Sequence, residues 1–283
     1  MEFCVIDLHV HSVYSDGTDT PAELVALAEA RGLTAMALTD HDTVGGIEDL
    51  LTAAESSSVE AVPGIELSAE CDRGTMHILG YFIDPHCTTL IERIERVRAG
   101  RDERNKEILK RLNKLGYIIM WSEVERQAGC DVIGRPHFAD ALVERGHVKT
   151  RKAAFDFLLG KGRPAYVERY RYSARECIEM IREAGGVSVL AHPATIYLQD
   201  DQLHALIMGL REHGLDGIEA FYAEHKPENI QKFCQWAEEF GLICTGGTDY
   251  HGANSPDLRL GTGFGQLRVP DEALNQLKAA VGR

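Results

Sequence analysis

The chain has 283 residues, of which 44% are hydrophobic, and carries a formal net charge of -14 at neutral pH. This length suits one α/β barrel with an insertion, and no apolar run approaches the roughly 18 residues that cross a bilayer. The first residues lack the basic segment of a signal peptide, and the seven cysteines show no C-x-x-C spacing and argue against disulfides. We therefore expect a cytoplasmic protein without membrane contact. The sequence indicates no protein partner.

The first predicted strand starts at residues 3–7 and continues into "DLHVHSVYSDGT". Alternate residues of a strand point to the same face, so we expect His9 and His11 on one face and Leu8 and Val10 on the other. Two interpretations fit the histidine pair. It is either an ordinary hydrogen-bonded pair, or part of a metal site whose other ligands lie at the ends of other strands.

Six further apolar runs predict strands at residues 34–40, 60–68, 76–82, 186–192, 216–222 and 242–249. Helical patterns between several of these runs predict parallel strands joined by crossover helices, whereas the short link between the second and third of them predicts a hairpin. Seven strands favour a barrel, although a doubly wound open sheet would show the same pattern.

Three of the predicted helices have clear boundaries. The helix at residues 20–32 has Thr20 at its N-cap and Glu23 three residues later, and it ends at a glycine. The helix at residues 173–186 repeats this arrangement with Ser173 and Glu176. A third helix, at residues 226–241, also stops at a glycine.

Helical patterns replace the strands between residues 88 and 165. This change predicts a helical insertion subdomain at residues 88–165 and a barrel formed by residues 1–87 and 166–283. Residues 91–171 hold 19 Lys/Arg against 12 Asp/Glu, so this basic segment suits an anionic ligand. The acidic chain as a whole does not suit long duplex nucleic acid, whose binding depends on many phosphate contacts.

Polar side chains collect at the ends of the predicted strands. In chain order they are His9, His11, Asp40, His41, Asp42, Glu66, His77, His192, Asp249 and His251. Functional groups of parallel barrels gather at the carboxyl ends of the strands, and His77 would join them if its strand ran antiparallel to its neighbours. These imidazole and carboxylate groups predict a polynuclear metal site, which suits Mn²⁺, Fe²⁺ or Zn²⁺ better than Mg²⁺.

The motifs "DLHVHSVYSDG", "LTDHDT", "GIE", "LAHP" and "GTDYHG" resemble those of the PHP (polymerase and histidinol phosphatase) family of metal-dependent phosphoesterases. In the insertion, "GRPHFADAL" and "KGRPAYV" resemble the branch that acts on 3',5'-nucleoside bisphosphates and short 5'-phosphorylated RNA. The resemblance implies a distorted seven-stranded (β/α) barrel of PHP type with a helical insertion. It also implies three divalent metals, with manganese as the first choice, and direct hydrolysis by metal-bound hydroxide.

The resemblance further implies three sets of metal ligands. His9, His11, Glu66 and Asp249 would hold one metal, Glu66, His77 and His192 a second, and Asp16, His41 and His251 a third. Among these residues, Glu66, Asp249 and His192 are assigned catalytic roles, with Glu66 bridging two metals. Asp40 and Asp42 are expected to orient His41 from outside the ligand set.

Substrate phosphates that do not react need cations of their own. Arg135 in "GRPH" is the first candidate because a guanidinium binds phosphate in a bidentate manner, and Lys161 and Arg163 follow. His137 is expected to contact the substrate, with a metal role as the alternative. The remaining histidines fall in predicted helices or turns and are expected at the surface: His86, His147, His204, His213 and His225.

The predicted function is removal of the 3'-phosphate from a 3',5'-nucleoside bisphosphate, with short single-stranded 5'-phosphorylated RNA as a second substrate. Three alternatives remain open at this point. The metal motifs would also serve a histidinol-phosphate phosphatase. A metal amidohydrolase acting on carbon would use the same barrel and ligands, and the metals of a non-enzymatic module would be structural.

Overall fold

The computed structural model describes residues 5–128 and 132–282. The chain divides into two compact units, one formed by Met1–Ile94 with Tyr172–Arg283 and the other by Glu95–Arg171. The sequence-based boundaries at residues 88 and 165 lie a few residues before these positions. The difference arises because helix α3 (Thr88–Lys114) begins in the first unit and continues into the second. Of the first predicted strand, Phe3 and Cys4 lie outside the described residues.

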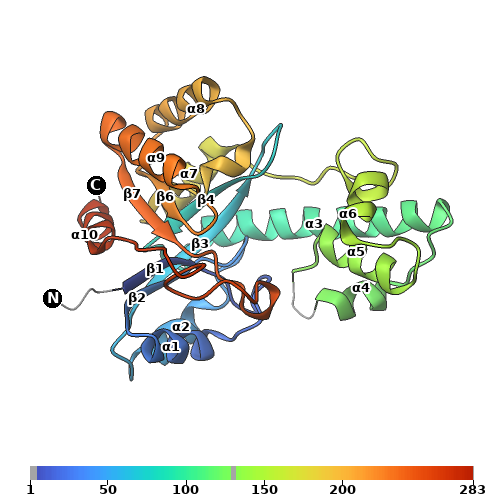
Figure 1. Cartoon of the computed structure of the whole chain (residues 1–283), viewed down its shortest axis with the longest axis horizontal. Helices are drawn as coiled ribbons and strands as arrows, with labels where there is room; N and C mark the ends of the chain where they lie inside the picture. Colours follow the sequence, from blue (N-terminus) through green and yellow to red (C-terminus); the bar gives the residue numbers. More distant parts are fainter. Residues whose placement is uncertain (1–4, 129–131, 283) are drawn as a thin grey trace. The chain divides into compact units, whose positions relative to one another are not determined.

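The first unit is built around seven strands, which confirms the number predicted from the apolar runs (Figure 1). They are β1 (Val5–Val10), β2 (Leu33–Leu38), β3 (Glu60–Ala69), β4 (Met76–Tyr81), β5 (Val187–Leu190), β6 (Gly217–Tyr222) and β7 (Ile243–Gly247). Strands follow one another around the sheet in chain order. All neighbours pair in parallel except β4, which is antiparallel to both β3 and β5, so the predicted hairpin is confirmed.

The two outer strands of the sheet meet, which makes the sheet a nearly closed barrel. The backbone N–H of Asp249 donates to the His9 carbonyl at 2.9 Å, and the N–H of His11 donates to the Tyr250 carbonyl at 2.9 Å. A Cβ atom at Gly247 would overlap the Cβ and backbone nitrogen of His9. Glycine is therefore required where β7 approaches β1, and the barrel replaces the open sheet as the correct architecture.

Helices cover the barrel strands on the outside. They are α1 (Pro21–Ala30), α2 (Ile47–Ala54), α7 (Ala174–Glu183), α8 (Asp200–Glu212), α9 (Pro227–Phe240) and α10 (Asp271–Ala280), with short 3-10 turns at Pro193–Ile196 and Gly252–Asn254. The capping boxes predicted at Thr20 and Ser173 are both present. Helix α9 ends at Gly241, whose φ of 64° gives the left-handed cap expected of a glycine.

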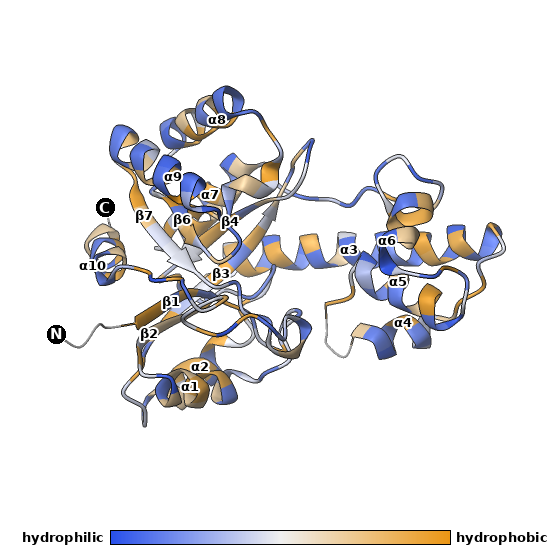
Figure 2. Cartoon of the chain, viewed as in Figure 1, coloured by the Kyte–Doolittle hydropathy of each residue, from blue (hydrophilic) through white to orange (hydrophobic). Residues whose placement is uncertain are grey.

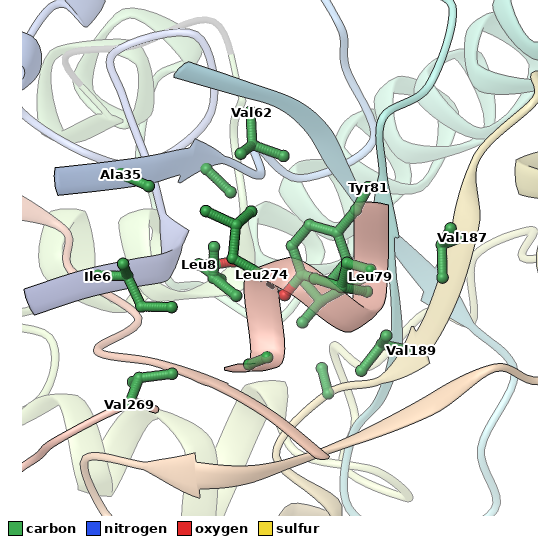
Figure 3. Close-up of a cluster of buried hydrophobic side chains, with 14 of the residues drawn as sticks. Ile6, Leu8, Ala35, Val62, Leu79, Tyr81, Val187, Val189, Val269 and Leu274 are labelled. Atoms are coloured by element: carbon green, nitrogen blue, oxygen red, sulfur yellow. Dashed lines mark hydrogen bonds between the residues drawn. The ribbon is translucent and has the colours of Figure 1, made fainter. Parts of the chain in front are cut away.

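Apolar side chains from β1 to β5 and from α10 form one continuous core (Figure 3). Leu8 belongs to this core, whereas Val10 packs in a second cluster with α1 and α2. The prediction that Leu8 and Val10 share one face is therefore wrong. The reason is a register shift between Asp7 and Val10 in the pairing of β1 with β2, because such an irregularity redirects the side chains that follow it.

The second unit is helical, as its sequence predicts. It contains the larger part of α3, followed by α4 (Trp121–Ala128), α5 (Arg135–Glu144), α6 (Arg151–Ala154) and a π-helical turn at Phe155–Leu159. Its core includes Ile108 and Leu112 of α3, packed with Phe138 and Leu142 of α5. Helix α3 alternates hydrophobic and hydrophilic residues along its length (Figure 2). Among the described residues, no helix combines the length and apolar composition needed to cross a membrane.

Candidate metal centre

Glu66, in β3, is the middle of the candidate site. It is fully buried, and both oxygens of its carboxylate face imidazole rings. The Oε2 atom lies 2.7 Å from Nδ1 of His41 and 3.4 Å from Nε2 of both His9 and His11. The Oε1 atom lies 2.7 Å from Nδ1 of His77 and 3.0 Å from Nε2 of His192. One carboxylate therefore connects five histidines that come from four strands or their ends, namely β1, β2, β4 and β5.

Asp249, Asp16 and His251 complete the assembly. The Oδ1 atom of Asp249 lies 3.3 Å from Nε2 of His9 and 3.0 Å from Nε2 of His11. The Oδ1 atom of Asp16 lies 3.1 Å from Nε2 of His251. The structure thus brings all nine sequence-predicted metal ligands into one assembly, although they are spread over more than 240 residues of the chain.

Donor atoms of eight of these nine residues fall into three groups, each of which could hold an ion because its donor atoms lie within 4.8 Å of one another, and His192 belongs to none of the three. The groups are His9, His11, Glu66 and Asp249; His11, Asp16, His41 and His251; and His41, Glu66 and His77. The first has the same members as the set implied by the family resemblance. The other two differ from the implied sets because His11 and His41 each lie between two groups.

Buried donor atoms without hydrogen-bond partners show that this assembly fits metal ions. They are Nε2 of His9, Nε2 of His11 and Oδ1 of Asp16, together with Nδ1 of His41 and Oε2 of Glu66, which lie at ion-pair distance from each other but form no hydrogen bond. Buried polar atoms are normally hydrogen-bonded, and an unpaired one costs about 1–3 kcal/mol. Ions with mixed nitrogen and oxygen ligands would satisfy all five atoms, and this donor set suits Mn²⁺, Fe²⁺ or Zn²⁺.

Glu219, in β6, is a residue of the candidate site that the sequence analysis missed. It is fully buried, and its Oε1 accepts a hydrogen bond from Nδ1 of His9 at 2.9 Å. Its Oε2 accepts a hydrogen bond from the backbone N–H of His192 at 2.7 Å. Because Nδ1 of His9 donates to this carboxylate, Nε2 carries the lone pair that faces Glu66 and Asp249. A single acid inside the apolar run "GIEAFY" was the signal that could have identified it.

Other contacts hold the ligands in place in similar ways. Nδ1 of His251 donates to the carbonyl of Asp249 at 2.7 Å, so its Nε2 is free to face Asp16. The hydroxyl of Tyr222 donates to Oδ2 of Asp249 at 3.1 Å. Nδ1 of His192 lies 3.0 Å from the hydroxyl of Thr195. Each contact fixes the orientation of a candidate ligand before an ion binds.

Asp40 has a different role from the one expected. Its carboxylate accepts hydrogen bonds from the backbone N–H and the hydroxyl of Ser12 and from the hydroxyl of Ser15. Both ring nitrogens of His41 instead face Glu66 and Asp16. The expectation that Asp40 orients His41 is therefore wrong, because its carboxylate is engaged by the loop that leads from β1 to Asp16.

Asp42 likewise makes its contacts on the side of β3. Its carboxylate accepts from the backbone N–H of Ser68 at 2.8 Å and from the Ser68 hydroxyl at 2.9 Å.

Asp42, His192 and Asp249 also have positive φ angles of 51°, 24° and 58°. Such backbone conformations in residues other than glycine cost about 1–3 kcal/mol each and concentrate at functional sites.

The electrostatics of the assembly favour ionised carboxylates. Burial alone would raise the pKa of Glu66, but His77, His41 and His9 outweigh burial and hold its pKa well below the usual value. Burial lowers the pKa of His77 to about 4. At His41 the charges of Glu66 and Asp16 overcome burial and raise the pKa to about 9. At His251, Asp16 and Asp249 raise the pKa to about 10.

The expected substrate contacts belong to the unit Glu95–Arg171. Arg135 is the first residue of α5, and its guanidinium lies 5.4 Å from the centre of the Tyr166 ring. Nδ1 of His137 accepts a hydrogen bond from the backbone N–H of Gly134 at 3.1 Å, at the start of the same helix. Lys161 and Arg163 are exposed in the loop that follows the π-helical turn.

A pocket of about 570 Å³ in the barrel unit is lined by Tyr222, whose hydroxyl contacts Asp249. Other lining residues include Phe264, which is 57% exposed, and His225. His225 is buried, which corrects its expected surface position. Its Nδ1 donates to the carbonyl of Ala220 at 2.9 Å, and its ring packs against Tyr222. The pocket has the volume of a typical small-molecule site.

Three comparisons with known proteins agree on the relationships of this chain. A family model described as PHP domain matches residues 7–224. A 3',5'-nucleoside bisphosphate phosphatase from Chromobacterium violaceum is 35% identical over 249 residues, which cover 87% of both chains. A 5'-3' exoribonuclease from Haemophilus influenzae is 33% identical over 245 residues, covering 87% of this chain and 89% of that protein. Among solved structures, an amidohydrolase from Chromobacterium violaceum with bound sulfate and no metal has a TM-score of 0.84 at 33% identity, covering 99% of this chain and 98% of that chain.

Proposed function

The chain belongs to the PHP domain family and is a phosphoesterase, and on that premise we propose that it removes the 3'-phosphate from 3',5'-nucleoside bisphosphates. The observation that carries this proposal is the Glu66 assembly, in which buried carboxylate and imidazole atoms without hydrogen-bond partners converge from the strand ends. Short 5'-phosphorylated RNA is the proposed second substrate, because the similar protein from Haemophilus influenzae is named a 5'-3' exoribonuclease.

We propose that the site holds three divalent ions and that Mn²⁺ is the first choice. Such ions would activate a water molecule and stabilise the charge that develops on the phosphoryl group. The chain's own residues prepare the site for them. Glu66 sets the spacing of the imidazoles on its two sides. Glu219 fixes the tautomer of His9, and Tyr222 fixes the orientation of Asp249. Glu66, Asp249 and His192 are the proposed catalytic residues, because each would hold an ion at the reaction site.

Two features favour a nucleotide over a simple phosphate ester. The pocket lined by Tyr222 and Phe264 offers an exposed aromatic ring, and nucleobases stack on such rings. The basic unit Glu95–Arg171 supplies Arg135, His137, Lys161 and Arg163 as proposed contacts for the phosphate that is not hydrolysed. A nucleotide substrate also favours a cytoplasmic location, as do the five described cysteines, none of which forms a disulfide.

Phosphate release tests this proposal directly. Purified protein is incubated with Mn²⁺ and with adenosine 3',5'-bisphosphate, 5'-AMP, histidinol phosphate or a short 5'-phosphorylated RNA, beside an Asp249→Asn control. We expect turnover of the bisphosphate, slower cleavage of the RNA and no reaction in the control. If histidinol phosphate alone is hydrolysed, the family assignment stands and the proposed bisphosphate substrate is refuted.

An amidohydrolase that acts on carbon is the second candidate, because the similar solved structure carries that name. The same protein contains bound sulfate, which resembles phosphate in shape and charge. A panel of amide and lactone substrates separates the two functions. Hydrolysis of those substrates without phosphate release from any ester would establish carbon chemistry in place of phosphoryl transfer.

A further inference from the structure

Cys234 and Cys244 lie side by side in the barrel unit, and we refer to them as the cysteine pair. Their Sγ atoms are 3.0 Å apart, and neither takes part in a disulfide. Cys234 belongs to α9 and Cys244 to β7, so the pair connects a helix with the strand that follows it. A disulfide bond is about 2.0 Å long, so the sulfur atoms need to approach by only about 1 Å to form one.

The turn between α9 and β7 fixes this contact. The helix ends at Gly241, whose left-handed conformation turns the chain back toward the strand. The backbone N–H of Leu242 donates to the carbonyl of Ala237 at 2.8 Å. Cys244 pairs with Ile218 in the parallel ladder that joins β7 to β6. Backbone hydrogen bonds therefore position both cysteines, and their contact does not depend on long, flexible side chains.

The hydrogen bond between the two sulfur atoms makes the thiols chemically unequal. It lowers the pKa of Cys234 and raises the pKa of Cys244. The thiolate is the nucleophile in exchange between thiols and disulfides, so Cys234 is the residue that reacts first. Both side chains are partly exposed, which gives a small reagent access to them.

The other described cysteines have different surroundings. The Sγ atom of Cys71 donates to the carbonyl of Arg73 at 2.8 Å, and that of Cys87 donates to the carbonyl of Glu183 at 3.8 Å. Cys177 is fully buried, and burial raises the pKa of its thiol. Cys71 is exposed to reagents but has an oxygen neighbour, so it serves as the matched control for the cysteine pair.

We propose that the cysteine pair is a site of reversible oxidation, at which a small-molecule disulfide such as oxidised glutathione converts the two thiols into one disulfide bond. The thiolate of Cys234 attacks one sulfur of the reagent, which forms a mixed disulfide and releases one glutathione thiolate. Cys244 then loses its proton to solvent and attacks Sγ of Cys234, and the second glutathione leaves as a thiolate. Two electrons pass from the protein to the reagent, and reduced glutathione reverses both steps.

The disulfide would join the two elements that lead to the candidate metal centre. The first turns of α9 line the pocket beside Tyr222, and β7 ends shortly before Asp249. Because the sulfur atoms already touch, oxidation needs no rearrangement of either element, and we expect it to stabilise the fold without changing the site. Disulfides in the cytoplasm are usually transient, which matches a reversible bond. This inference is independent of the substrate that the site hydrolyses.

Mass spectrometry tests the proposal on the full chain. The reduced protein is incubated with oxidised glutathione, its remaining thiols are alkylated, and it is digested with trypsin. Both cysteines of the pair fall in one tryptic peptide, residues 233–259. We expect this peptide to lose two hydrogen atoms and to carry no alkyl group, and reduced glutathione should restore both thiols. The Cys71→Ala control should behave in the same way.

Single variants test the order of the two steps. Cys244→Ala should accumulate a mixed disulfide between glutathione and Cys234, because no second thiol is present to displace it. Cys234→Ala should leave Cys244 largely alkylated. Cys234→Ser is the second variant, for use if the alanine variant does not fold. If glutathione is found on Cys244 in place of Cys234, then the proposed order of reaction is wrong.

Thermal unfolding supplies a second readout. The disulfide joins residues ten positions apart and restricts the unfolded chain, so oxidation should raise the Tm of the unchanged protein and of Cys71→Ala by about 5 °C. It should leave the Tm of Cys234→Ala unchanged. The proposal is overturned if both cysteines of the pair remain alkylated after oxidation, if the reaction stops at the mixed disulfide in the unchanged protein, or if the oxidised protein has the Tm of the reduced one.

Discussion

Replacing Glu219 with glutamine tests how the chain prepares a metal ligand. The carboxylate of Glu219 accepts two hydrogen bonds, one from the backbone N–H of His192 and one from Nδ1 of His9. Glutamine has only one acceptor oxygen. Because the backbone N–H cannot change, that oxygen faces His192, and the new NH₂ group faces Nδ1 of His9.

The consequence is a change of tautomer in His9. Nδ1 must now accept a hydrogen bond, so the ring proton moves to Nε2, which is the buried atom that faces Glu66 and Asp249. A metal ion cannot bind a nitrogen that carries a proton. Loss of such a supporting contact typically weakens metal affinity 10- to 100-fold, which is about 1.4–2.8 kcal/mol. We expect this loss in Glu219→Gln without a change of fold.

The assay is a titration of the metal-free protein with Mn²⁺. Calorimetry measures the binding affinity, and phosphatase activity is measured at each Mn²⁺ concentration. Glu224→Gln, an exposed acid a short distance along the chain, is the matched control and should retain the original affinity. If Glu219→Gln binds Mn²⁺ as tightly as the control does, then the tautomer of His9 is not set by Glu219 and the reasoning is refuted.

Three further predictions concern the same assembly. Gly247→Ala should lower Tm by several degrees and reduce metal content, because the new methyl group overlaps His9 where β7 meets β1; a Tm equal to that of the unchanged protein would contradict the required close approach. Asp16→Asn should lower the number of bound Mn²⁺ ions per chain by one in elemental analysis, while an unchanged ratio would show that Asp16 is no ligand. At pH 7.5, metal binding should release protons, because His41 and His251 have pKa values of about 9 and about 10 in the metal-free protein and must lose a proton to bind; heats of binding that are equal in buffers of different ionisation enthalpy would contradict this.

The sequence predicted the fold well, and it identified residues that the structure brings together, for a physical reason. Parallel strands bring their carboxyl ends to one edge of the sheet. Polar residues at the ends of the apolar runs are therefore expected to lie close together in the folded protein. His192 and Asp249 were found in this way. His77 was found at the start of its run, because a hairpin reverses the strand direction, and the structure confirms that β4 is antiparallel.

Residues inside regular elements were harder to identify. Glu219 lies within an apolar strand, where alternation gives no sign that its side chain meets His9. The register shift in β1 separated Leu8 from Val10, because an irregularity in strand pairing depends on contacts with distant segments.

The closure of β7 on β1 also sets the order in which the molecule can be completed. The residues that join these two strands, from Thr248 to Tyr250, bond to Asp7, His9 and His11 near the beginning of the chain. A nascent chain therefore exposes His9 and His11 long before Asp249 and His251 have been synthesised. Its barrel remains open, and the first group of candidate ligands lacks a member, until β7 and the residues that follow it leave the ribosome.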